Sequence, residues 1–311
     1  MIRSLIIMDK SFGEDQRFRL TFKVKENGVC LREFLSEKEI SKRTLTATKY
    51  EGGRLAVNGI ERDVRHILSA GDEVEILFPP EELSSGLIAE EGDLDIIYED
   101  EAILILNKPP GQSTIPSFNH RLGTIANYTA GKFLREGIPS TVHVVTRLDL
   151  HTSGLLCIAK NRHIHHLLGT QIEKFGFHRQ YEAIVEGHVV QNEFFIDERI
   201  GRKDGSIIER IVRSDGKEAR TDVQVLKRFT KNGCKLTKVG LTLHTGRTHQ
   251  IRVHMQWAGH SLAGDDLYGG SEALITRQAL HCSSLAFDHP ITGERKLFTG
   301  RIPADMEKLL T

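Results

Sequence analysis

The sequence of 311 residues lacks the features that mark membrane, secreted and zinc-binding proteins. No apolar run approaches the roughly 20 residues that a membrane-spanning helix needs. The N-terminal stretch MIRSLIIMDKSFGEDQ reaches charged residues before a secretory hydrophobic region can form. The four cysteines are far apart and form no CxxC pair, which argues against a disulfide framework and a structural zinc site. They are Cys30, Cys157, Cys234 and Cys282. We therefore expect a cytoplasmic protein with reduced thiols and no membrane association.

Charge is divided unevenly along the chain, although the formal net charge is zero. Residues 1–80 hold 14 Lys and Arg against 13 Asp and Glu, residues 81–101 hold none against nine, and residues 102–311 hold 28 against 20. The last segment also carries 14 of the 15 histidines. Nucleic-acid binding needs only a local basic face, because contacts to phosphates release counterions. A polyanionic partner is therefore compatible with the neutral total, and so is an ordinary surface of mixed charge.

The N-terminal part of the chain has the pattern of two short helices. Apolar residues between positions 31 and 35 have helical spacing, and Ser41 is a suitable N-cap for a second helix that runs to Lys49. The basic residues of this second helix are Lys42, Arg43 and Lys49. We expect them to share a helix face.

A small sheet is expected after these helices. Asn58-Gly59 stands between apolar residues, as in a tight hairpin turn, and residues 72–78 alternate as in a strand. Over about fifty residues the order of helix, "ISKR", "VNG" and "GDEVEI" resembles the S-four-type RNA-binding domain, with a core at about 28–78. The resemblance implies that Lys42, Arg43 and Lys49 contact RNA. A generic α+β module without a ligand is the alternative.

The next segment has the composition of a linker. Residues 81–93 combine serine, glycine and an unbroken acidic excess, and two prolines precede them. We expect an acidic linker here, between an N-terminal domain at 1–80 and a larger domain at 94–311. In the larger domain, short apolar strands alternate irregularly with helices near 125–134 and 164–175. Because no glycine-rich phosphate loop is present, the pattern argues against dinucleotide and nucleoside-triphosphate enzymes.

Two charged residues stand just before an apolar strand in the segment HVVTRLDLHTSGLLCIAKN. Arg147 and Asp149 lie at the rim of a strand that is expected to be buried. A carboxylate in such a place costs free energy unless it is paired, and a nearby arginine keeps it ionised. This position favours a functional aspartate. A structural bridge between Arg147 and Asp149 is the alternative.

A second segment, LTLHTGRTHQIRVHMQWAGHSLAGDDLYGG, concentrates hydrogen-bond donors at the start of a helix. We expect the helix to begin at Thr248, with His249 and Arg252 on one side and Arg247 just before it. Such donors suit phosphate oxygens or a carboxylate. His249 and His254 are five positions apart and no glutamate accompanies them, so the HExxH metal pattern is missing. We expect no metal.

Five segments, in order, resemble the motifs of RluA-type pseudouridine synthases. They are YEDEAILILNKPPG, TRLDLHTSGLLCIAKN, RQYEAIVEG, HTGRTHQIRVHMQWAGHSLAGDDLYG and RQALHCSSLAFDHPITGE. The resemblance extends over nearly all of residues 94–302. Five motifs in family order are far more specific than any one of them.

The resemblance implies a role for individual residues. Asp149 matches the catalytic aspartate, Tyr181 the tyrosine that packs on the target base, and Arg252 the basic residue that pairs with the aspartate. Arg147, Arg247 and His249 are expected to contact RNA. The chain departs from the family pattern at Thr146, where many members have histidine, and at Arg179, where lysine is common.

Fold and function follow from the same resemblance. It implies an α+β protein, with a mixed, mainly antiparallel catalytic sheet and a small N-terminal α+β RNA-binding domain. It also implies isomerisation of specific uridines in structured RNA to pseudouridine, without a cofactor, by an enzyme expected to be a monomer. Ribosomal RNA is the expected substrate, with transfer RNA as the other candidate. A carboxylate serves this reaction either as a nucleophile on the sugar or as a base that removes a sugar proton.

Two other functions use the same residues differently. A non-catalytic RNA-binding or ribosome-assembly factor needs the basic residues but not Asp149. A hydrolytic glycosidase needs a second carboxylate beside the bond that breaks. Asp265 and Asp266, in the segment GDDLYGG, are the candidates for that second acid.

Overall fold

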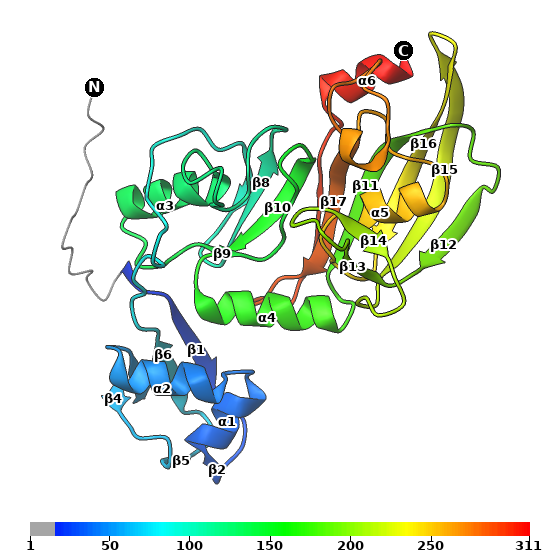
Figure 1. The fold of residues 1–311 in the computed structure, drawn as a ribbon. Coiled ribbons are helices and arrows are strands. Elements are labelled where there is room, and N and C mark those ends of the chain that lie inside the picture. The colour runs from blue at the N-terminus through cyan, green and yellow to red at the C-terminus, as the bar shows by residue number, and fades with distance from the viewer. Residues whose placement is uncertain (1–15) are drawn as a thin grey trace, which may run out of the picture.

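The computed structural model describes residues 16–311 of the chain. Residues 1–15, which include most of the N-terminal stretch considered above, lie outside the described residues. Figure 1 shows a small unit near the N-terminus and a larger unit built on one long sheet. No helix within the described residues is both long and apolar enough to cross a membrane.

The small unit is built as its sequence pattern predicts. Its elements are β1 (Arg19–Lys23), β2 (Val29–Cys30), α1 (Leu31–Glu37), α2 (Lys42–Tyr50), β3 (Arg54–Val57), β4 (Ile60–Glu61), β5 (Ile67–Leu68) and β6 (Glu73–Leu77). The sheet has the order β1-β6-β3-β4, and a two-stranded pair, β2-β5, accompanies it. Helix α2 is capped by the Ser41 side chain, which accepts a hydrogen bond from the Thr44 amide at 3.1 Å. Asn58 and Gly59 both have positive φ in the turn between β3 and β4, as a two-residue hairpin turn requires.

The larger unit is a ten-stranded sheet with helices on both faces. Its strands are β7 (Ile96–Glu99), β8 (Ile103–Lys108), β9 (His143–Val144), β10 (Ser153–Ala159), β11 (His178–Glu186), β12 (Glu193–Asp197), β15 (Arg220–Lys231), β16 (Cys234–Leu243), β17 (Leu280–Asp288) and β18 (Arg295–Thr299). The main order is β12-β15-β16-β11-β17-β10-β8-β7. Strands β10 and β17 are parallel, whereas the other described pairs of this sheet are antiparallel. The predicted α+β class, with a mixed and mainly antiparallel sheet, is confirmed.

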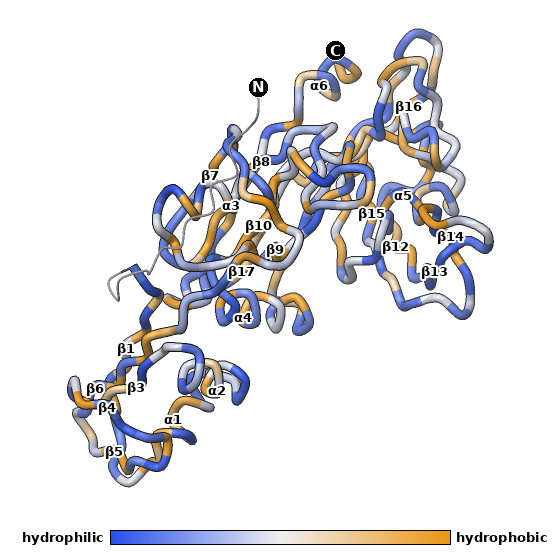
Figure 2. The backbone as a smooth tube through the Cα atoms, turned by 60° about the vertical axis from the view of Figure 1, so that its left-hand side comes forward, coloured by the Kyte–Doolittle hydropathy of each residue, from blue (hydrophilic) through white to orange (hydrophobic). Residues whose placement is uncertain are grey.

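Helices cover both faces of β8 and β10, which explains why these strands are almost wholly apolar. The remaining elements are α3 (Ile125–Glu136), α4 (Arg162–Glu173), a hairpin of β13 (Ile200–Arg202) and β14 (Arg210–Val212), α5 (Gln250–Trp257), the short helix η2 (Asp266–Tyr268) and α6 (Ala304–Leu310). Side chains of α3 share one buried cluster with β8 and β10, and side chains of α4 and α5 share the main cluster on the other face. Figure 2 shows the concentration of hydrophobic residues in β10 and its neighbours.

The acidic segment 81–93 has no helix or strand, but hydrogen bonds hold it against the larger unit. Asn127 of α3 donates a hydrogen bond to the Ile88 carbonyl at 2.7 Å, and His143 pairs with Glu81 at 2.6 Å. A Cβ at Gly131 would lie 2.0 Å from a backbone oxygen of this segment, so α3 needs glycine there. The segment therefore packs along α3 and is not a free linker.

Candidate active site

A cleft of about 540 Å³ lies where three loops and strands of the larger unit meet. The loop before β10 contributes Asp149, strand β11 contributes Tyr181, and the start of α5 contributes Arg252. Asp149 and Arg252, which are 103 positions apart in the sequence, therefore line the same cleft. Arg147, Arg247 and His249 also line it, so the structure brings six of the nine predicted site residues together.

The backbone around Asp149 is held by buried polar side chains. Thr114 donates a hydrogen bond to the Leu148 carbonyl at 2.8 Å and accepts one from the Leu148 amide at 3.2 Å. Lys108 donates to the Leu150 carbonyl at 3.0 Å. Both neighbours of Asp149 are therefore anchored, which fixes the direction in which its carboxylate enters the cleft.

Lys108 at the end of β8 is fully buried and belongs to this anchorage. Its ammonium also donates to the carbonyls of Pro109 and Gln112, each at 2.8 Å. Burial lowers the pKa of Lys108 to about 7, against the opposing effect of the Asp149 charge. The lysine of the first motif thus joins two loops under the cleft.

Arg252 joins Asp149 to a second carboxylate. Its Nε and Nη2 donate to Asp265 at 2.8 and 2.7 Å, and its Nη1 donates to Asp149 at 3.3 Å. Its guanidinium carbon lies 4.9 Å from the centre of the Tyr268 ring. Burial disfavours the charged guanidinium, but the hydrogen bonds and charges of Asp265 and Asp149 outweigh burial and raise the pKa of Arg252.

This network changes two of the sequence interpretations. The side chain of Asp265 is fully buried, and both of its carboxylate oxygens accept hydrogen bonds from Arg252. Asp265 is therefore not free to act as the second acid of a glycosidase. Arg147 is exposed and forms no ion pair with any described residue, so the expected alternative of a bridge to Asp149 is wrong. Asp149 lies against the start of α5, and the ion pair therefore forms with Arg252.

His249 occupies an unusual backbone position at the edge of the cleft. The helix begins at Gln250 and not at Thr248 as expected, because His249 adopts a left-handed conformation, with φ 58°. Its Nδ1 pairs with the Tyr268 hydroxyl at 2.9 Å, and its Nε2 lies 3.8 Å from the Asp149 carboxylate. Burial lowers the pKa of His249, and the neighbouring Arg252 adds to the decrease against the effect of Asp149. At neutral pH this histidine is therefore a neutral hydrogen-bonding group.

Tyr181 and Arg247 take different positions in the cleft. Tyr181 is buried on β11, and burial raises the pKa of its hydroxyl well above the usual value, so the phenol stays protonated. Arg247 is exposed and donates through Nε to the Glu218 carbonyl at 2.8 Å. Two of its guanidinium nitrogens remain for a ligand.

The three basic residues of α2 are not part of this cleft. Lys42, Arg43 and Lys49 are exposed and form no ion pair with a described residue. Figures 1 and 2 both show α2 at the end of the molecule away from α5 and α6. Any contact they make with a ligand is separate from the site at Asp149.

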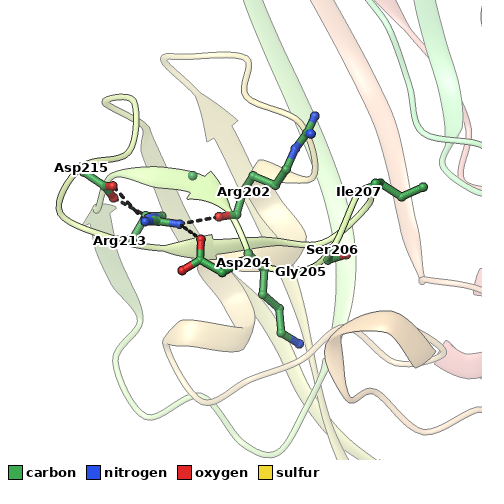
Figure 3. A pocket seen from close by; sticks show the side chains of 9 residues that line it. Arg202, Asp204, Gly205, Ser206, Ile207, Arg213 and Asp215 are labelled. Carbon is green, nitrogen blue, oxygen red and sulfur yellow. Dashed lines mark hydrogen bonds and ion pairs between the residues drawn. The ribbon is translucent and has the colours of Figure 1, made fainter.

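A second hollow, of about 600 Å³, lies on the β13–β14 hairpin (Figure 3). Arg213 dominates it, but this arginine already bonds Asp204, Asp215 and the carbonyl of Arg202. The charge of Arg213 is therefore satisfied inside the hairpin, and the two carboxylates that line this hollow, Asp204 and Asp215, both pair with it. The cleft at Asp149 is the better candidate for an active site.

Comparisons with known proteins identify the family of the chain. A sequence model of the family RNA pseudouridylate synthase matches residues 102–257. An uncharacterized RNA pseudouridine synthase of Bacillus subtilis, YjbO, is 45% identical, and the match covers 91% of this chain and 98% of the relative. The ribosomal large subunit pseudouridine synthase D of Pseudomonas aeruginosa is 36% identical over 86% of this chain and 87% of its own.

A solved structure agrees as well. Human RNA pseudouridylate synthase domain containing 1 matches with a TM-score of 0.56 and 26% identity, over 71% of this chain and 86% of that chain. The family predicted from the five motifs is thereby confirmed. The family model leaves the small N-terminal unit unmatched. The chain belongs to the RNA pseudouridylate synthase family and is an RNA pseudouridine synthase, an isomerase of uridine in RNA.

Proposed function

We propose that Asp149 is the catalytic carboxylate of this isomerase and that the substrate is ribosomal RNA of the large subunit. The observation that carries the first part is the contact between Asp149 and the buried Arg252–Asp265 pair in the cleft that Tyr181 lines. The name of the Pseudomonas aeruginosa relative supports the second part.

The main requirement of the reaction is a single well-placed carboxylate of the protein. The bond between the sugar C1′ and uracil N1 breaks, the uracil turns, and C1′ bonds to C5, without a redox change or an added group. Asp149 acts either on C1′ as a nucleophile or on a sugar proton as a base. Arg252, which is held in place by Asp265, orients the carboxylate through the 3.3 Å hydrogen bond.

Tyr181 has the properties of a surface on which the detached base turns. Stacking on a ring tolerates rotation better than directional hydrogen bonds do. Because its hydroxyl stays protonated, we assign Tyr181 this packing role and no proton transfer. Arg147, Arg247 and His249 line the same cleft and are proposed to contact the RNA around the flipped nucleotide.

The small unit is proposed to be a second RNA-binding surface. Lys42, Arg43 and Lys49 lie exposed on one short helix and have no acidic partner within residues 16–311. We assign the S-four-type domain to 1–80, the acidic connection to 81–93 and the catalytic domain to 94–311. We also propose that the enzyme works as a monomer in the cytoplasm.

The test uses purified protein and transcripts of large-subunit ribosomal RNA, with pseudouridine mapped at single-nucleotide resolution. Asp149→Asn should abolish modification, because the amide is neither a nucleophile nor a base. Asp266→Asn is the matched control, since Asp266 is exposed, follows Asp265 directly and does not line the cleft. Full activity of Asp149→Asn would overturn the catalytic assignment. Modification of transfer RNA alone would overturn the substrate assignment.

A further inference from the structure

Arg179 lies in the cleft, but the roles assigned so far leave it unused. It precedes Tyr181 by two positions on β11, so both side chains point to the same side of the sheet. Both line the cleft, and Arg179 is only 8% exposed. The guanidinium is therefore buried beside the surface proposed to receive the base.

Arg179 is unusual among the buried arginines of this structure because it has no acidic partner. Within residues 16–311, the other two buried arginines each form a two-pronged ion pair, Arg252 with Asp265 and Arg277 with Asp305. Arg179 forms no ion pair with any residue in that part of the chain, and its Nε is buried without a hydrogen-bond partner. A buried guanidinium is costly unless an anion compensates it. The arrangement suits an anion that arrives with the substrate.

The loop between β16 and α5 completes a place for such an anion. A Cβ at Gly246 would lie 2.8 Å from Arg179 Nη1, so the guanidinium rests against the backbone of this loop. The amides of Gly246 and Thr248 donate no hydrogen bond to another described residue, and both residues line the cleft at the start of α5. Backbone amides of such a loop and a guanidinium fork are both suited to phosphate oxygens.

The charge of the cleft favours a phosphate over the uracil base as the partner. Four arginines line the cleft, whereas Asp149 is its sole carboxylate among the described lining residues. Uracil is neutral and its oxygens do not compensate a buried positive charge. Each nucleotide of RNA carries one negative charge, and that charge is on its phosphate.

We propose that Arg179 binds the phosphate of a nucleotide at or next to the isomerised uridine, together with the loop at Gly246. This inference rests on the proposed function for the position of the target. Arg179 acts as a positioning residue: it holds the RNA backbone so that the sugar lies at Asp149 while the base lies on Tyr181.

The test measures binding, so that it does not depend on catalysis. The probe is a labelled twelve-nucleotide oligouridine, titrated with the full chain at several salt concentrations. Arg179→Met should weaken binding by about tenfold to a hundredfold, as expected for the loss of a hydrogen bond to a charged group. It should also reduce the slope of log affinity against log salt by about 0.7, because one phosphate contact of a single strand is lost. Arg295→Met is the matched control, since Arg295 is exposed and lies outside the cleft.

Two further measurements separate this proposal from a structural role and from failure of the catalytic assignment. Arg179→Met should leave the melting temperature of the free protein unchanged or raise it, because an uncompensated buried charge is removed. Arg179→Lys should keep the salt slope and still lose affinity, because lysine keeps the charge but lacks the fork. Wild-type affinity and slope in both variants would overturn the proposal. Asp149→Asn should bind oligouridine as the wild type does, so a failed Asp149 assay leaves the Arg179 result standing.

Discussion

The pair of Arg252 and Asp265 gives the most quantitative prediction. Its side chains are 7% and 0% exposed, and two hydrogen bonds of 2.8 and 2.7 Å join them. Removing Asp265 leaves the buried guanidinium of Arg252 with its weaker 3.3 Å hydrogen bond to Asp149, and the loss of one member of a buried pair costs about 3–5 kcal/mol. Asp265→Leu should therefore lower the free energy of unfolding by that amount. It should also slow pseudouridine formation, because Arg252 is no longer held against Asp149.

A double-mutant cycle isolates the interaction. Arg252→Met alone should cost about as much as Asp265→Leu, since it leaves the Asp265 carboxylate buried and unpaired. The double variant Arg252→Met with Asp265→Leu should recover most of the lost stability, because apolar side chains of similar volume replace the pair, but it should remain inactive.

The assay is urea denaturation, combined with pseudouridine formation by the same proteins. Asp288→Ala supplies the control, because its exposed ion pair with Arg295 should contribute only about 0–1 kcal/mol. Additive losses in the double variant, or a single loss below about 1 kcal/mol, would refute the reasoning.

Three other predictions concern separate parts of the molecule. Burial lowers the pKa of His163 to about 4, below its usual 6.5, so the unfolded chain binds more protons than the folded chain between these two pH values. The contribution of His163 to stability is therefore fully present above about pH 6.5. The free energy of unfolding should fall by about 2 kcal/mol between pH 7 and 5. His163→Phe, which keeps the stacking on Phe78, should remove this loss in urea titrations at the two pH values. Tyr181→Phe should retain far more activity than Tyr181→Leu in a kinetic assay, because only the ring is needed; equal losses would contradict the packing role. Lys108→Met should lower the melting temperature, because it leaves buried carbonyls without donors at about 1–3 kcal/mol each, and an unchanged value would contradict its anchoring role.

Local signals in the sequence were sufficient for most of the fold. The cap at Ser41, the turn at Asn58-Gly59 and the apolar run after Asp149 predict the elements that the structure has. These signals act within a few residues of each other and do not depend on distant contacts. The family resemblance gave the class of the sheet, mixed and mainly antiparallel, but the strand order was not predicted, because pairings such as β10 with β17 join segments more than a hundred residues apart.

The site was predictable as a set of residues but not as a network. The family resemblance indicated Asp149, Tyr181 and Arg252, whereas Asp265 was missed as the partner of Arg252. Asp265 stood in the sequence only as a possible second acid, and nothing local indicates that its carboxylate is buried against a helix that begins fifteen residues earlier. The sequence also could not show that Arg179 has no acidic partner within residues 16–311, because this depends on which carboxylates the fold places near it. Burial of charge is decided by tertiary packing.

The most direct test of the central claim is pseudouridine mapping on total RNA from cells that lack this protein, complemented with the normal chain or with Asp149→Asn. The account predicts that specific sites in large-subunit ribosomal RNA are lost and that only the normal chain restores them. Restoration by Asp149→Asn would contradict the catalytic assignment, and the absence of any lost site would contradict the proposed substrate.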